Sequence, residues 1–118
     1  MAFIELNDGS TIRNLQIVYK KATTTGFEEA SKLRTGSAIL VKGKINKNKS
    51  TFEVIADQIF ILKESSEDYP LQKKEHSMEF LRDIAHLRTR TQTFSAIMNV
   101  RSKLAFAIHK FFNENGFK

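Results

Sequence analysis

The sequence predicts an α+β protein: an incomplete β-barrel of four strands and one helix, followed by a linker and a long amphipathic α-helix. Three observations predict this class. Apolar and polar residues alternate within residues 3–18 and again within 37–62, as in half-buried strands. Apolar residues recur at helical spacing across residues 94–115. Residues 63–75 are polar and charged and hold the only proline, as is typical of a linker.

Composition limits the classes of protein to consider. The 118 residues suffice for one domain, or for one small domain and part of another. The absence of cysteine excludes disulfides and thiolate metal sites. No apolar run is long enough to span a bilayer and the N-terminus has no signal-peptide pattern, so we expect a cytoplasmic protein without a membrane partner. The net charge of +6 favours a polyanionic partner, or else a solvated basic surface with no partner.

Residues 3–18 predict a β-hairpin with a two-residue turn at Gly9-Ser10. In that register Ile4 faces Leu15, and Phe3 faces Gln16. Arg13 then falls on the apolar face near the turn, which requires a bulge or a side chain that snorkels to water. Because side chains alternate between faces, the core face should carry Ile4, Leu6, Leu15 and Ile17, and the other face Phe3, Glu5, Asn14 and Gln16.

The face opposite the predicted core has the chemistry to hold an unpaired base. The ring of Phe3 offers a surface for stacking, and the amide of Gln16 can both donate and accept hydrogen bonds at a base edge. Glu5 and Asn14 add polar groups on the same face. Alternatively, Phe3 covers a second small core and Gln16 is an ordinary polar strand residue.

The next elements complete the predicted barrel. A short helix should follow Thr25, which forms a capping box with Glu28, and should end at Gly36. Residues 37–45 and 51–62 read as strands joined by a turn at 46–49. Strand, strand, helix, strand, strand matches strands two to five of the OB-fold, a five-stranded Greek-key barrel. Its first strand would have to precede Met1, so we expect the barrel to be incomplete.

The C-terminal part is predicted to be helical. Ser77 can cap a short helix, residues 87–91 form a basic turn, and Thr93 and Gly116 bound a final helix of about 20 residues, roughly 30 Å long. Such a long apolar stripe requires a large surface to pack on. Arg101 lies within the stripe, where it either pairs with a carboxylate across an interface or snorkels.

Catalytic chemistry is not predicted from the residues themselves. The sequence has no glycine-rich phosphate loop, no histidines at metal-ligand spacing and no cysteine nucleophile, so we expect no catalytic residue and no metal site. The three histidines are dispersed. The residues alone therefore indicate a binding module joined to a packing helix.

Six segments carry a resemblance to a known family: residues 3–10, 14–18, 69–77, 79–82, 85–91 and 94–117. Over essentially its whole length the chain resembles an N-terminal fragment of bacterial asparaginyl-tRNA synthetase, a class II aminoacyl-tRNA synthetase. The resemblance implies an anticodon-binding OB-fold at residues 1–64 without its first strand, a linker at 65–77, and the start of the catalytic domain at 78–118. The motif 1 helix of that domain would span about 94–115.

The resemblance also implies roles for individual residues. Phe3 would stack on the central anticodon uridine of tRNA-Asn and Gln16 would hydrogen-bond it, with Glu5 and Asn14 beside them. Contacts to the RNA backbone are expected from Lys42, Lys44, Lys47 and Lys49. A homodimer interface along the long helix would involve Phe94, Ile97, Met98, Arg101, Leu104, Ile108 and Phe111.

Members of this family attach asparagine to tRNA-Asn with ATP and Mg²⁺. The motifs 2 and 3 that hold ATP and activate the amino acid are missing here, so no cofactor is expected in this chain, and we expect it not to catalyse aminoacylation alone. Two other functions remain open: a general single-stranded nucleic-acid-binding OB module that uses the same ring and lysines, and a non-catalytic dimerising module that works through residues 94–115.

Overall fold

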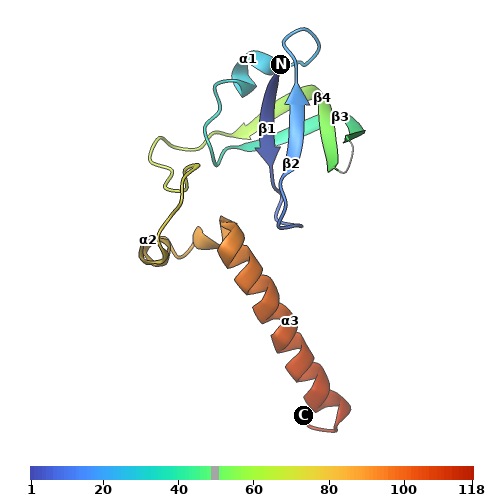
Figure 1. Cartoon of the computed structure of the whole chain (residues 1–118), viewed down its shortest axis with the longest axis vertical. Helices are drawn as coiled ribbons and strands as arrows, with labels where there is room; N and C mark the ends of the chain where they lie inside the picture. Colours follow the sequence, from blue (N-terminus) through green and yellow to red (C-terminus); the bar gives the residue numbers. More distant parts are fainter. Residues whose placement is uncertain (49–50) are drawn as a thin grey trace. The chain divides into compact units, whose positions relative to one another are not determined.

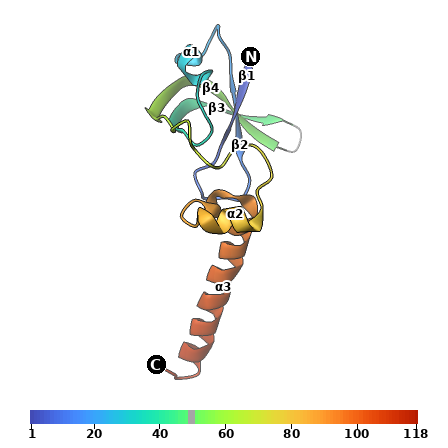
Figure 2. The same cartoon turned by 90° about the vertical axis from the view of Figure 1, so that its left-hand side faces the viewer.

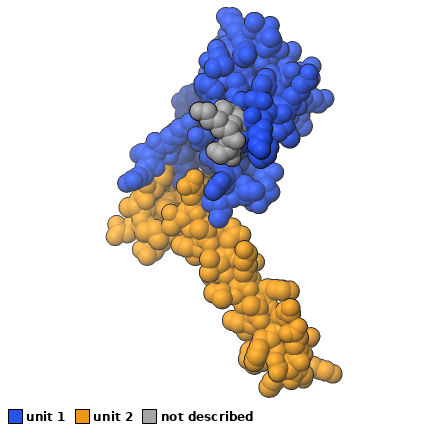
Figure 3. Space-filling view, turned by 45° about the vertical axis from the view of Figure 1, so that its right-hand side comes forward, with its two compact units in different colours: residues 1–75 blue, residues 76–118 orange. Residues whose placement is uncertain are grey.

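The computed structural model describes residues 1–48 and 51–118. The chain divides into two compact units, Met1–Glu75 and His76–Lys118, which are coloured separately in Figure 3. Each unit is described by itself. Within the described residues, no helix combines the length and apolarity needed to cross a membrane.

The first unit is built on a four-stranded sheet: β1 (Ala2–Leu6), β2 (Leu15–Tyr19), β3 (Ala38–Asn48) and β4 (Thr51–Lys63). Figure 1 shows these strands side by side in the order β1-β2-β4-β3. The β2–β4 pair is parallel, and the pairs β1–β2 and β3–β4 are antiparallel. The predicted α+β class, with four strands, one short helix between them and a long C-terminal helix, is confirmed.

The predicted register of the first hairpin is wrong by two residues. Ile4 pairs with Ile17 and not with Leu15, and Phe3 pairs with Val18 and not with Gln16. Residues 7–14 form a loop in place of the two-residue turn, because their own side chains hold it. The Asn7 side chain accepts from Gly9 N–H at 2.7 Å and donates to the Thr11 carbonyl at 3.2 Å. Arg13 lies in this loop and is exposed, so the predicted bulge or snorkelled side chain is not needed.

A shift of two residues keeps every side chain on its predicted face, since strand faces alternate with period two. Ile17 is 1% exposed and centres the core, and Ile4 and Leu6 pack against it. Leu15 lies on the same face, at the end of β2 next to the loop, and is 38% exposed.

The β3–β4 ribbon is longer than predicted, and its register shifts at two places. The shift between Lys42 and Gly43 leaves Asp57 as the extra residue on β4, and the shift between Ala38 and Ile39 leaves Leu62. At Gly43 the backbone of β4 comes so close that an added Cβ would overlap the carbonyl oxygen of Ile55. The predicted turn at 46–49 is wrong for residues 46–48, which continue β3; Lys49 lies outside the described residues.

The helix α1 is shorter than predicted, spanning Phe27–Ala30, and Thr25 does not cap it. Thr25 instead pairs with β4: its N–H donates to the Asp57 carbonyl at 2.9 Å, and its carbonyl accepts from Ile59 N–H at 3.0 Å. The N-cap is Gly26, which has a left-handed φ of 86° and leaves no room for a Cβ beside the Ile59 carbonyl oxygen. Gly36 lies beyond the helix and does not end it.

The core of the first unit lies between α1 and the sheet. Its buried residues are Ile17, Tyr19, Ala30, Ala56 and Ile59. The ring of Phe27 on α1 packs 5.2 Å from the ring of Tyr19, centroid to centroid. Buried Thr24 joins the segment before α1 to the sheet, because its hydroxyl accepts from Lys20 N–H at 3.0 Å and donates to the Ala56 carbonyl at 2.7 Å.

The second unit contains α2 (Met78–Asp83), a 3₁₀ turn η1 (Arg88–Arg90) and α3 (Gln92–Glu114). Ser77 caps α2 as predicted, with its hydroxyl accepting from Phe80 N–H at 3.2 Å. The predicted cap of the long helix, Thr93, is wrong. Thr91 is the cap: it is extended and its hydroxyl accepts from Phe94 N–H at 3.4 Å, so the helix begins two residues earlier.

Helix α3 spans 23 residues. It runs unbroken in Figure 2, and most of its apolar side chains are exposed. Phe94 is its buried residue, with the guanidinium carbon of Arg88 4.9 Å from the ring centroid. Ile97, Leu104, Ile108 and Phe111 are 44–60% exposed. Gly116 follows the helix with a φ of 83°, consistent with the predicted stop.

Candidate nucleic-acid interface

The sheet face opposite the α1-covered core is the candidate interface, and we call it the outer face. Cross-strand register sets two rows on it. One row crosses the sheet from three apolar residues, Phe3, Val18 and Ile55, to Lys44. A polar row beside it consists of Glu5, Gln16, Glu53 and Asn46.

Phe3 is available for stacking. Its side chain is 55% exposed, whereas Val18 behind it in the row is 6% exposed. The ring therefore lies above an apolar floor and is not enclosed in a core. It also lies on the face opposite Ile4, as the alternation predicts.

The ring and the amide are diagonal neighbours. Phe3 pairs with Val18, and Gln16 pairs with Glu5 in the next position. Diagonal side chains on one face of an antiparallel pair lie roughly 7–8 Å apart, which is within reach of an aromatic ring and a long amide. One base can therefore touch both groups, even though the predicted direct pairing is wrong.

Glu5 and Asn14 are tied into a hydrogen-bonded chain. Asn14 Nδ2 donates to Glu5 Oε2 at 3.1 Å, and Asn7 Nδ2 donates to Asn14 Oδ1 at 3.0 Å. These bonds fix the carboxylate beside Gln16 and leave acceptor capacity on it. The structure thus brings all four predicted base-contacting residues (Phe3, Glu5, Asn14 and Gln16) to one region.

Asp8 stabilises the loop that joins β1 to β2 and that supplies Asn7 and Asn14. Its Oδ1 accepts from the Ser10 hydroxyl at 2.6 Å and from Ser10 N–H at 2.9 Å. These two hydrogen bonds to the charged form lower the pKa of the Asp8 carboxyl from its ordinary value. At neutral pH the carboxylate that holds this loop is therefore charged.

Two residues of the polar row were missed by sequence reasoning. Glu53 on β4 is the register partner of Gln16, and Asn46 on β3 is the partner of Glu53, with Asn46 Nδ2 donating to Glu53 Oε1 at 2.8 Å. Alternation alone places Glu53 on a face but does not say which strand is next to it. The OB-fold strand order, with its parallel pair, would have revealed this neighbour.

The predicted backbone-contacting lysines do not all lie together. Lys42 and Lys44 alternate with Gly43 on β3 and so lie on the outer face. Lys47 pairs with Phe52 on the opposite face. Lys49 lies outside the described residues.

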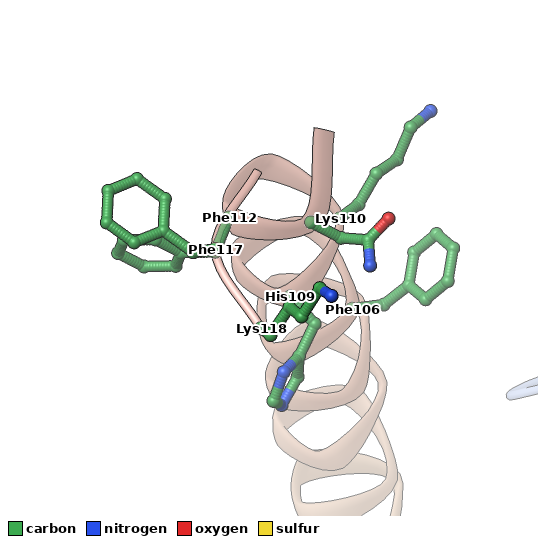
Figure 4. A pocket seen from close by; sticks show the side chains of 7 residues that line it. Phe106, His109, Lys110, Phe112, Phe117 and Lys118 are labelled. Atoms are coloured by element: carbon green, nitrogen blue, oxygen red, sulfur yellow. The ribbon is translucent and has the colours of Figure 1, made fainter. Parts of the chain in front are cut away.

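A hollow lies near the end of α3 in the second unit (Figure 4). Phe106 points to one side of the helix end, and the rings of Phe112 and Phe117 lie together on the other. The lining includes His109 and two lysines but no carboxylate, so it does not assemble the acid, base and nucleophile of a catalytic site. Elsewhere too, within residues 1–48 and 51–118, no three histidine, cysteine or acidic side chains gather as metal ligands.

Residues 1–62 match the tRNA anti-codon family, described as an OB-fold nucleic acid binding domain. The chain is 53% identical over 99% of its length to an asparagine–tRNA ligase of Malacoplasma penetrans, and 56% identical over 98% to one of Acetivibrio thermocellus. It spans 26% and 25% of those two relatives, about a quarter of their length.

A solved structure gives the same result. The asparaginyl-tRNA synthetase of Pyrococcus horikoshii, complexed with asparaginyl-adenylate, superposes with a TM-score of 0.84 at 27% identity. The match covers 97% of this chain and 27% of that one. The resemblance to asparaginyl-tRNA synthetase is confirmed.

Proposed function

The chain belongs to the OB-fold nucleic acid binding family of the tRNA anti-codon type, and from this premise we propose that its sheet binds the anticodon of tRNA-Asn. One observation carries the proposal: an exposed aromatic ring beside amides and carboxylates on one face of the sheet. Single-stranded bases are recognised by stacking on such rings and by hydrogen bonds to their edges.

Each group of the outer face has a role in this proposal. Phe3 stacks on one unpaired base, and Gln16 reads its edge as donor and acceptor. Glu5 and Asn14, held in position by their hydrogen bonds, limit which base edge fits. Lys42 and Lys44 meet phosphates, a contact that gives affinity without sequence preference.

The test is binding of a tRNA-Asn anticodon stem-loop to the 118-residue chain, measured in competition with a homopolymeric RNA. Phe3→Ala should weaken binding by about 1–3 kcal/mol, the value of one stacked base. Phe52→Ala is the matched control, because Phe52 is 60% exposed on the opposite face of the same sheet. Equal loss in both variants would contradict the proposal. Equal competition by the homopolymer would favour a general single-strand binder.

The greater length of the relatives extends the proposal to a longer protein. Because the chain matches about a quarter of each asparagine–tRNA ligase, we propose that it acts as part of such an enzyme, in the cytoplasm, with ATP and Mg²⁺ bound by other parts. The chain alone should show no asparagine-dependent ATP–pyrophosphate exchange. Exchange by the purified chain would refute this assignment.

A second proposal concerns α3: its exposed stripe joins two copies of the chain into a homodimer. Support comes from Ile97, Leu104 and Ile108, which share one side of a 23-residue helix at 44%, 58% and 56% exposure. Apolar area of this kind is characteristic of the buried core of an interface.

Analytical ultracentrifugation tests the dimer. The double variant Ile97→Glu/Ile108→Glu should sediment as a monomer and still bind the anticodon stem-loop. Asn99→Glu, exposed on the opposite side of α3, is the control and should sediment as the unaltered chain does. If the unaltered chain itself sediments as a monomer, α3 does not hold two copies together and the proposal of a homodimer fails.

A further inference from the structure

The outer face carries a second set of ring, amide and ammonium groups beyond the β-bulge. We propose that Phe60, Gln58 and Lys42 form a second nucleotide subsite, which stacks a further base of the same single-stranded RNA. The proposal rests on the proposed function of the outer face and extends it to a longer stretch of RNA.

Register places the three groups on one face. Lys42 pairs with Gln58, and Leu40 pairs with Phe60. On β3, residues 40, 42 and 44 alternate without interruption, so this set lies on the same face as Lys44 in the row of Phe3. From Lys44 to Leu40 is four residues along β3, or about 13 Å. The second set is therefore a continuation of the first along β3, with Lys42 between the two.

Apolar side chains are exposed on this part of the outer face. Phe60 is 44% exposed, and its register partner Leu40 is 42% exposed. Single exposed apolar residues are common on protein surfaces, but these two are cross-strand neighbours. They form an apolar surface beside Gln58 and Lys42.

The position of Lys42 favours a nucleotide as the occupant. Its Nζ lies 5.4 Å from the centroid of the Phe60 ring, so the ammonium and the ring present a cation and a stacking surface to one ligand. A base on the ring would place its phosphate near the ammonium. Gln58 offers the donor and acceptor pair that Gln16 offers at the first set.

Charge and continuity favour RNA over protein. The chain carries a net charge of +6, and both sets include a lysine of β3. OB-folds that bind single strands contact about 4–16 nucleotides, whereas Phe3 can stack only one base. A strand held at Phe3 therefore needs further contacts on this face.

Oligouridylates of two lengths, about three and about ten nucleotides, test the proposal with the whole chain. Phe60→Leu, which keeps an apolar side chain and removes the ring, should weaken binding of the longer oligomer about 5- to 150-fold, the loss of one stacked base. It should leave the short oligomer unchanged. Phe52→Leu makes the same change on the opposite face of the sheet, so it is the control and should bind both oligomers as the unaltered chain does.

Salt dependence gives a second readout. Lys42→Gln should lower the slope of log affinity against log salt by about 0.7 for the longer oligomer, the value for one phosphate contact on a single strand. Lys47→Gln, on the opposite face of the same strand, is its control. An unchanged slope for Lys42→Gln counts against the subsite.

The outcomes separate the two proposals. If Phe3→Ala weakens both oligomers while Phe60→Leu binds both normally, the second subsite is wrong and the first stands. If Phe3→Ala changes neither, the proposed function fails and the second subsite fails with it. If Phe60→Leu alters self-association and leaves RNA binding intact, the surface is a protein contact and the proposal is overturned.

Discussion

The sheet of the first unit and helix α3 of the second both have clear apolar periodicity, but they differ in what covers the apolar residues. In the sheet, Ile17, Tyr19 and Ile59 are at most 5% exposed. In α3, Phe94 alone is buried, and Leu104 and Phe106 are 58% and 70% exposed. Similar patterns thus lead to a core in one region and to a bare surface in the other.

The difference follows from how the two elements satisfy their backbones. A strand needs a neighbouring strand for its hydrogen bonds, so a sheet and its packing form together. A helix satisfies its own backbone and is defined before any partner packs on it. Helical periodicity therefore predicts the element without predicting what covers it.

Both tyrosines of the chain, Tyr19 and Tyr69, lie in the first unit, and the chain has no tryptophan. Tyrosine fluorescence therefore reports on the sheet. Far-ultraviolet circular dichroism is dominated by α3, the longest helix. The two signals allow each region to be followed separately in the predictions below.

The largest expected contrast is between two isoleucines. Ile17→Ala should lower the free energy of unfolding of the first unit by about 2–5 kcal/mol, because it leaves a cavity at a fully buried position. Ile108→Ala should change the stability of either unit by less than about 0.5 kcal/mol at low protein concentration, because Ile108 is 56% exposed. Urea unfolding followed by both signals measures this. Equal losses would mean that α3 is covered in solution.

Backbone conformation gives a second contrast, within the first unit. Gly26→Ala should destabilise the sheet by roughly 1–3 kcal/mol or more, since a Cβ there meets the Ile59 carbonyl oxygen and the φ of 86° is strained. Gly9→Ala has nearly the same φ, 84°, but nothing within 4 Å of the added Cβ. The smaller loss of stability expected for Gly9→Ala measures the cost of the left-handed φ alone. Tyrosine-detected melting should fall further for Gly26→Ala, with the α3 signal unchanged.

A buried hydrogen-bonded hydroxyl should give a smaller loss. Thr24→Val keeps the shape but removes the acceptor for Lys20 N–H and the donor to the Ala56 carbonyl, at an expected cost of about 1–3 kcal/mol.

Thr91→Ala removes the cap of α3 and should cost about 0.5–2 kcal/mol of helix stability. The first variant should alter the tyrosine transition and the second the helical signal. If Thr24→Val altered the helical signal, or Thr91→Ala the tyrosine transition, the two regions would not unfold separately.

Sequence reasoning was most successful where one periodicity governs a long segment. The existence of β3, β4 and α3, and the faces predicted for Phe3–Leu6 and for Leu15–Ile17, follow from alternation or helical spacing. The register of β1 and β2 does not follow, because it depends on side-chain bonds within residues 7–14, such as Asn7 to Gly9. The cap of α3 was misplaced because Thr91 and Thr93 are equally good candidates by type alone.

The candidate site was predicted only in part for a related reason. Phe3, Glu5 and Gln16 are close in sequence, and pleating alone brings them to one face. Glu53 and Asn46 reach the same row through a parallel pairing between β2 and β4, which no local pattern encodes. A site assembled across strands requires the strand order as well as the alternation.

The smallest expected effect concerns the loop that joins β1 to β2. The pKa of Asp8 is lowered in the folded chain by the hydroxyl and N–H of Ser10, so these bonds stabilise the loop at pH values above the ordinary carboxyl range. The stabilisation is lost as the pH falls through the folded-state pKa, when the carboxyl is protonated.

Ser10→Ala removes the larger contribution and should move the Asp8 pKa up toward its ordinary value, which an NMR titration of the carboxyl carbon measures. The pKa of Glu28, lowered by Lys21 in the same unit, should not move and serves as the internal reference. Since Asn7 of this loop holds Asn14 beside Glu5, a loop loosened by acid should also weaken binding at the outer face, whereas the helical signal of α3 should not respond.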